Sequence, residues 1–135
     1  MKKTVKIILA ICLLAAFSLC ACGGTSDIVL LKKESYFNQF YIKGNKVCVD
    51  CNIVLHNQSD KVKKVKLLAH MKEDADNGLL KDTEVNGYDK NENDVFVLPA
   101  NSKEEYKVNF IGDFAGKEEK RNRNLPEIEI IEVEN

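Results

Sequence analysis

The feature that most constrains the fold is a strict alternation of apolar and polar side chains. After the turn residues Gly44 and Asn45, apolar side chains recur at every second position from Val47 to Leu55. A period of two puts these side chains on one face of an extended strand, whereas a helix needs a period near 3.6. Because a Gly-Asn pair favours a tight two-residue turn, Ile42 is expected to face Val47. The sequence therefore predicts a hairpin whose second strand is half-buried.

The same alternation returns along the rest of the chain, with polar turns at short intervals. Residues 28–41 fit either a strand or one helical face, and the pattern does not decide between them. About seven strands without a convincing long helix indicate an all-β, immunoglobulin-like antiparallel β-sandwich. In the last strand the apolar residues fall on both faces, so a bulge or burial on both faces is expected there. Beyond the hairpin, strands are expected at residues 64–72, 79–85, 95–98, 105–110 and 127–133.

The start of the chain has a different character, because lysines precede an apolar run from Ile7 to Leu19. This run is shorter than the roughly 20 apolar residues of a membrane-spanning helix, and it has the organisation of a signal peptide. It ends at a lipobox, in which Leu19 and Ala21 precede Cys22. Cys20 directly follows the bulky Leu19 and is the poorer candidate. We expect Cys22 to be lipidated; the alternative is an ordinary secretory signal with incidental cysteines.

These features divide the chain into a signal peptide at 1–21, a lipidated cysteine with a short tether at 22–27, and one domain at 28–135. The two acyl chains of a diacylglyceryl group on Cys22 are about what stable anchoring requires. The expected location is therefore the extracytoplasmic face of the cell membrane. All 21 acidic residues lie after the signal peptide, but not all 20 basic ones do, so the domain is mildly acidic. This charge argues against nucleic acid as a partner, and we expect a monomer.

The segment from Val54 to Lys61, Val-Leu-His-Asn-Gln-Ser-Asp-Lys, resembles a turn found in small bacterial lipoproteins with immunoglobulin-like (FxLYD-like) domains. Their turn has the pattern hydrophobic-x-Asn-x-Ser-Asp-Lys. The later segments Leu98 to Lys103 and Phe110 to Gly112 also suit the final strands of such domains. The resemblance implies an immunoglobulin-like fold and a place in the cell envelope. It carries over no catalytic residue.

Cys48 and Cys51 have the spacing of a redox or metal-binding pair. Within a strand, residues three apart point to opposite faces and lie roughly 10 Å apart at about 3.3 Å per residue, whereas a disulfide needs less than about 7 Å. The favoured interpretation puts Cys51 in the core and Cys48 on the other face. A bulge at Asp50 would still allow the bond.

Metal binding would need more ligands than this pair supplies, because a structural zinc site usually has four Cys or His ligands. Two acidic turns, residues 74–78 and 89–94, offer oxygen ligands, but neither completes the calcium-loop pattern. Both are interpreted as Asx-rich turns between strands. No cofactor is expected.

Two basic runs are the strongest candidates for a contact surface, for instance with an anionic envelope polymer: Lys61, Lys63, Lys64, Lys66, Lys117, Lys120, Arg121 and Arg123. Both runs also fit a solvated surface, because the first alternates with inward valines and the second with glutamates. No nucleophile–histidine–acid order or phosphate-binding glycine loop is recognisable, so an enzyme is not expected. We expect a binding module for an envelope protein or polymer. The alternative is a thiol-redox or metal-handling protein using Cys48 and Cys51.

Overall fold

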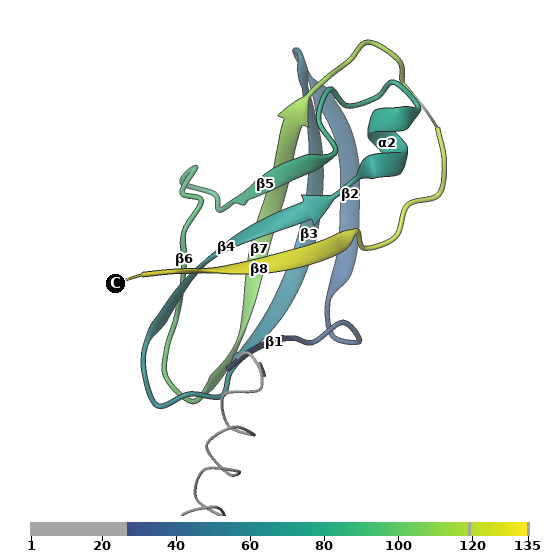
Figure 1. Cartoon of the computed structure of the whole chain (residues 1–135). Coiled ribbons are helices and arrows are strands. Elements are labelled where there is room, and N and C mark those ends of the chain that lie inside the picture. Colours follow the sequence, from purple (N-terminus) through teal and green to yellow (C-terminus); the bar gives the residue numbers. More distant parts are fainter. Residues whose placement is uncertain (1–26, 119, 135) are drawn as a thin grey trace, which may run out of the picture.

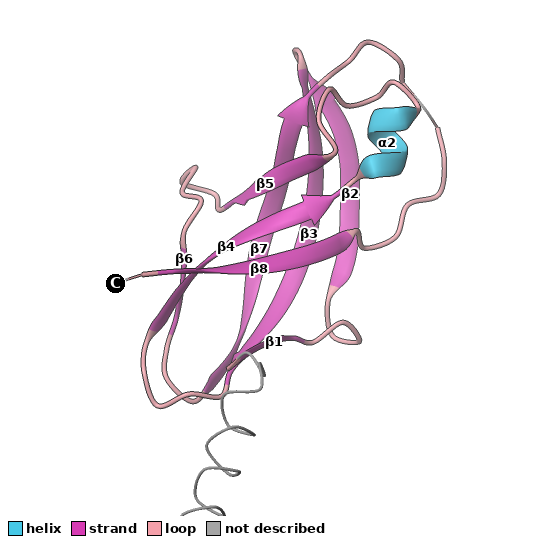
Figure 2. Cartoon of the chain, viewed as in Figure 1, coloured by secondary structure: helices cyan, strands magenta, loops and turns pink. Residues whose placement is uncertain are grey.

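The computed structural model describes residues 27–118 and 120–134, which form an antiparallel β-sandwich of the immunoglobulin-like type (Figure 1). The signal peptide, Cys22 and the tether before Asp27 lie outside the described residues. Almost all regular structure is strand (Figure 2), which confirms the expected fold class. The elements are β1 (Ile28–Leu30), β2 (Tyr36–Lys43), β3 (Lys46–Asn57), β4 (Lys63–His70), α2 (Lys72–Asp76), β5 (Glu84–Tyr88), β6 (Phe96–Leu98), β7 (Ser102–Asp113) and β8 (Glu127–Val133).

The strands form two layers joined through β5. In one layer, β3 pairs along its whole length with β7, and its other edge pairs with β2 and then β1. In the other layer, β4 pairs with β8 on one edge and with β5 and β6 on the other. The start of β5 pairs with β4 and its end with β7, so this strand passes from one layer to the other. In Figure 1 the shorter strands β4 and β8 cross the long strands β3 and β7.

The predicted hairpin is confirmed, because Ile42 pairs with Val47 across the β2–β3 turn. Gly44 has a φ of 61°, which suits the turn type that needs a glycine at its first central position. The apolar face of β3 lies in the core as predicted, and so do the inward residues of β4: Val47, Val49, Cys51, Ile53, Leu55, Val65, Leu67 and Ala69.

Three expectations about strands need correction or completion. Residues 28–41 contain two strands separated by a turn, and no helix. The predicted strand 79–85 is wrong in its first half, because the backbone N–H groups of Leu79 and Leu80 donate to the carbonyl oxygen of Asp74 in α2. In β8 the register with β4 is unbroken, and Ile131 is 42% exposed. Neither a bulge nor burial on both faces accommodates it.

Asn57 holds together two turns at one end of the sandwich. Its side chain is fully buried, and its Nδ2 donates to the carbonyl oxygens of Lys61 (2.8 Å), Leu98 (3.2 Å) and Pro99 (3.1 Å). Its Oδ1 accepts hydrogen bonds from the backbone and the hydroxyl of Ser59. A buried amide with these partners satisfies its own polar atoms and those of the turns. The Asn-x-Ser turn of the sequence is therefore a structural link between β3–β4 and β6–β7.

The described chain begins at this same end, since the Gln58 N–H donates to the Asp27 carbonyl oxygen at 2.8 Å.

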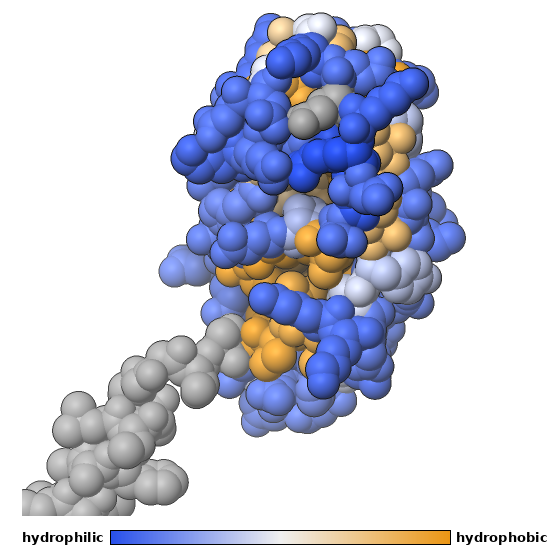
Figure 3. Space-filling model, turned by 90° about the vertical axis from the view of Figure 1, so that its right-hand side faces the viewer, coloured by the Kyte–Doolittle hydropathy of each residue, from blue (hydrophilic) through white to orange (hydrophobic). Residues whose placement is uncertain are grey.

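The edge strands β2 and β8 carry apolar side chains that are only partly buried against the core, among them Phe37, Ile128 and Ile130. Figure 3 views the molecule from the right-hand side of Figure 1, and hydrophobic residues remain visible there among hydrophilic ones, mainly in the lower half.

Candidate functional site

The outer face of the β2–β3–β7 layer carries polar side chains in cross-strand rows. In one row, Gln39 of β2, Asp50 of β3 and Asn109 of β7 lie side by side. The neighbouring row contains Tyr41 and Cys48. Because successive residues of a strand point to opposite faces, the alternation that fills the core from one side of β3 presents this polar set on the other.

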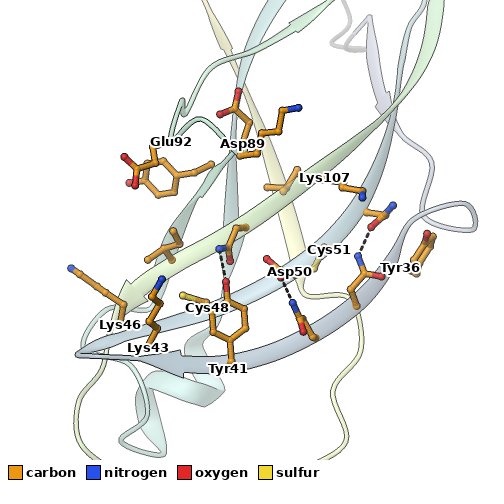
Figure 4. Close-up of a pocket in the computed structure, with 18 residues that line it drawn as sticks. Tyr36, Tyr41, Lys43, Lys46, Cys48, Asp50, Cys51, Asp89, Glu92 and Lys107 are labelled. Carbon is orange, nitrogen blue, oxygen red and sulfur yellow. Dashed lines mark hydrogen bonds between the residues drawn. The ribbon is translucent and has the colours of Figure 1, made fainter.

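The loop between β5 and β6 stands beside this face and turns it into a groove of about 770 Å³, which we call the outer-face groove. In Figure 4, Asp89 and Glu92 of this loop lie across from Tyr41 and Lys43 of β2, with Asp50 between them. Tyrosine, side-chain amide, lysine and carboxylate groups make up most of its lining. The groove therefore offers hydrogen-bond donors and acceptors among apolar surface of similar extent.

Hydrogen bonds between neighbouring strands fix the side chains of the groove. Gln39 Nε2 donates to Asp50 Oδ2 at 2.6 Å, and Asn109 Nδ2 donates to the Tyr41 hydroxyl at 3.1 Å. Burial raises the pKa of Tyr41, against the opposing effect of the bond from Asn109. Asn109 Oδ1 is buried and has no hydrogen-bond partner. An acceptor in this state is costly unless water or a ligand supplies a donor.

The loop wall of the groove is ordered by Asp89. Its Oδ1 accepts the backbone N–H groups of Asn91 (2.8 Å) and Asn93 (2.9 Å). The bond from Asn93 is the main reason that the pKa of Asp89 lies below its usual range. The Asx-rich turn expected at 89–94 is confirmed, and Glu92 within it has a φ of 64°. This turn positions the loop without using Asp89 for chemistry.

The two cysteines of β3 lie on opposite faces, as their spacing predicts, and both are free thiols. Cys51 is in the core, where burial, reinforced by the charge of Asp50, raises its thiol pKa to about 12. Cys48 lines the groove but is itself buried. Since the thiolate is the reactive form, Cys51 is poorly suited to redox chemistry at neutral pH.

No group of three His, Cys, Asp or Glu side chains lies close enough to share a metal ion within residues 27–118 and 120–134. His70 lies 3.4 Å from Glu84 and 3.8 Å from Glu129, on the outer face of the other layer. His56 pairs in register with Lys103 of β7. The two histidines thus lie in different layers, apart from the cysteines of the groove and the core.

The structure does not bring the two basic runs together. Lys61, Lys63, Lys64 and Lys66 lie before and along the first half of β4. By contrast, Lys117, Arg121 and Arg123 lie beside α2, which follows the far end of that strand. Lys63 lies 3.6 Å from Glu132 and Lys66 lies 3.3 Å from Asp94. These pairs are partly exposed, so each contributes little to stability.

Within the second run, Arg121 and Arg123 turn toward α2 and form a group that we call the Asp74 cluster, together with Asp74 and Phe40. Arg121 Nη2 lies 2.9 Å and Arg123 Nη1 lies 3.0 Å from Asp74 Oδ1. The Arg123 guanidinium lies 4.1 Å from the centre of the Phe40 ring, a cation–π contact. The Arg123 side chain is only 7% exposed. It is thus committed to the interior rather than to a contact surface.

The Asp74 cluster corrects the expectation of an Asx-rich turn between strands at 74–78. Residues 72–76 form the helix α2, and the carboxylate of Asp74 points into the protein, with 4% of its side chain exposed. No local pattern in the sequence indicates this arrangement, because the two arginines come from a distant segment. The available signal was only that the segment around Asp74 carries acidic residues and the segment of the two arginines carries basic ones.

Comparison of the chain with protein-family models, curated proteins and solved structures finds no match. The likeness to small FxLYD-like lipoproteins therefore stays a prediction, and the functional argument depends on the geometry above. In the described part of the chain, no helix has the length and apolar character needed to cross a membrane.

Proposed function

We propose that this chain is a lipid-anchored, non-enzymatic binding protein of the cell envelope, and that the outer-face groove holds its partner. The observation that carries the proposal is the groove itself, a hollow of about 770 Å³ on the outer face of the β2–β3–β7 layer. Binding sites on rigid elements keep their donors and acceptors in place before the partner arrives, which lowers the entropic cost of binding.

The groups in the groove suit hydrogen bonding better than proton transfer or nucleophilic attack. Asp50 accepts a bond from Gln39, Asp89 accepts the backbone of its own turn, and Lys46 pairs with Asp113. The Tyr41 pKa is raised, which disfavours its use as a base at neutral pH. A catalytic site usually contains titratable groups tuned toward the working pH, whereas Tyr41, which lies beside the Cys48 thiol, has its pKa moved away from neutrality.

The position of the groove suits an anchored protein. The chain enters at the Asn57 end of β3, whereas Lys43 and Lys46 in the groove lie at the other end of the sheet. At about 3.3 Å per residue, β3 spans roughly 36 Å between these ends. A lipid on Cys22 would hold the Asn57 end near the membrane and leave the groove facing outward.

The test of groove binding is the retention of the chain from Gly23 onward, which keeps the whole described fold, on washed envelope fragments of the source cells. Lys107 of β7 is exposed and lines the groove. Lys64 is exposed on the opposite layer, in the middle of a row between β6 and β8. Lys107→Glu and Lys64→Glu therefore make the same charge change on two faces of the molecule.

We expect sedimentation to retain the wild type and the Lys64→Glu variant equally and to lose Lys107→Glu at least fivefold. Circular dichroism provides the control for folding. Equal retention of the two variants, or no retention of the wild type, would refute the groove as the binding surface.

The anchor is tested separately by expressing the full chain in bacteria supplied with an alkyne-tagged fatty acid. We expect Cys22→Ala to abolish the label and Cys20→Ala to leave it, because only Cys22 follows the small residue that the lipobox requires. Label that survives Cys22→Ala would contradict lipidation at that residue.

A further inference from the structure

We infer that the ligand of the outer-face groove is a neutral glycan chain. This inference depends on the proposed function, since it takes the groove to be the binding site and identifies the class of molecule bound there.

The charge balance of the groove argues for a neutral ligand. Four lysines line it, and they are matched by Asp50, Asp89 and Glu92 in the lining and by Asp113, which bonds Lys46. A surface that attracts a polyanion or polycation carries an excess of one sign, which focuses the field on the ligand. The groove has no such excess.

The lining of the groove mixes polar and apolar surface in similar amounts. Amide, ammonium and carboxylate groups lie among the side chains of Tyr36, Tyr41, Tyr88 and Ile111. Such a mixture matches a sugar, which presents both hydroxyl groups and C–H faces.

The arrangement of these groups suits sugar rings in succession. Neighbouring strands lie about 4.8 Å apart, a spacing comparable with the length of one pyranose unit, and the row of Gln39, Asp50 and Asn109 repeats polar groups at that interval. Tyr36 is 50% exposed, so its ring offers a face on which the C–H groups of a sugar can pack.

The experiment is an NMR titration of the ¹⁵N-labelled chain from Gly23 with two neutral hexasaccharides, chitohexaose and cellohexaose. Hexaglutamate and hexalysine serve as charged peptide controls. We expect saturable shifts of backbone amides on β2, β3 and β7 with at least one hexasaccharide and none there with either peptide.

Two variants connect the shifts to the groove. Tyr36→Ala removes an exposed ring and should weaken binding at least fivefold, whereas Val97→Ala removes a side chain that is 51% exposed on the other layer and should leave binding unchanged.

The possible failures are distinguishable. If only a charged peptide shifted the amides of the groove, the glycan assignment would be overturned and groove binding would stay in place. The same conclusion would follow if neither hexasaccharide shifted these amides while envelope retention still depended on Lys107. Equal weakening by Tyr36→Ala and Val97→Ala would also overturn it. If envelope retention did not depend on Lys107, the proposed function itself would be refuted, and the glycan assignment with it.

Discussion

Residues 74–78 and residues 89–94 are both short acidic segments ending in turn-forming residues, yet the protein uses them in opposite ways. Asp74 is buried and bonds Arg121 and Arg123. Asp89 bonds the backbone of its own loop, at Asn91 and Asn93. The comparison teaches that the fate of an acidic segment is decided by what reaches it from elsewhere. Asp89 is satisfied locally, whereas Asp74 depends on arginines that follow it by almost 50 positions.

The two carboxylates should therefore differ in what they contribute. A buried charge that loses its partners is left in a medium that solvates it poorly, so breaking such a pair is costly. An exposed carboxylate in an Asx turn can exchange its hydrogen bonds to the backbone for hydrogen bonds to water at little cost in free energy. Replacing each carboxylate in turn tests this difference.

The largest effect is expected from Asp74→Ala, which leaves Arg123 buried without its carboxylate. The free energy of unfolding should fall by about 3–5 kcal/mol, measured by urea denaturation of the chain from Gly23. Asp76→Ala in the same helix is the matched control, because Asp76 is 58% exposed and pairs with the exposed Lys72. Equal midpoints for the two variants would contradict the role given to the Asp74 cluster.

A smaller effect is expected within β3, where Cys51 and Cys48 repeat the contrast between core and surface. Cys51→Ser puts a hydroxyl into the apolar core and should lower the free energy of unfolding by about 1–3 kcal/mol. Cys48→Ser faces the polar groove and should lower it by less. If Cys48→Ser proved the more destabilising variant, the assignment of Cys51 to the core face would be in error.

The cysteines also predict a difference in reactivity. Because burial raises the pKa of the Cys51 thiol to about 12, iodoacetamide at pH 8 should leave Cys51 unmodified in the folded chain and modify it in denaturant. Peptide mass mapping would detect the change. Modification of Cys51 at the same rate in both states would show that it is not protected.

The smallest effect is expected from Asp89→Asn, which keeps an acceptor oxygen but removes the charge. Because the pKa of Asp89 in the fold lies below its unfolded value, its charge stabilises the protein above the unfolded pKa, near 3.9. That contribution is lost as the pH falls through the lower folded pKa. Thermal melts should therefore show a small deficit for Asp89→Asn at pH 7 that shrinks as the pH is lowered below the unfolded pKa, near 3.9. A deficit that kept its size as the pH fell would exclude the charge as its cause.

The sequence predicted those parts of the fold that depend on neighbouring residues. The alternation along β3 and the Gly44 turn determine which side chains face the core, and the register follows from them. The Asn57 turn was recognised as a motif, but its hydrogen bonds to Leu98 and Pro99 required the fold to be known.

The parts that could not be predicted depend on distant segments. The outer-face groove combines residues of β2, β3 and β7 with the loop after β5, and no local pattern indicates that these meet. The strand expected at 79–85 starts only at Glu84, because Asp74 in α2 accepts the backbone N–H groups of Leu79 and Leu80. Arg121 and Arg123 read as surface residues because their partner is far away in the sequence.

The most direct test of the central claim is photocrosslinking of the full-length chain in its own cells. Benzoylphenylalanine would replace Tyr36 at the groove or Val97 on the other layer, two positions that are 50% and 51% exposed. Envelope material should become covalently attached at position 36 and not at position 97. Attachment at position 97 alone, or equally at both positions, would contradict the groove as the binding surface.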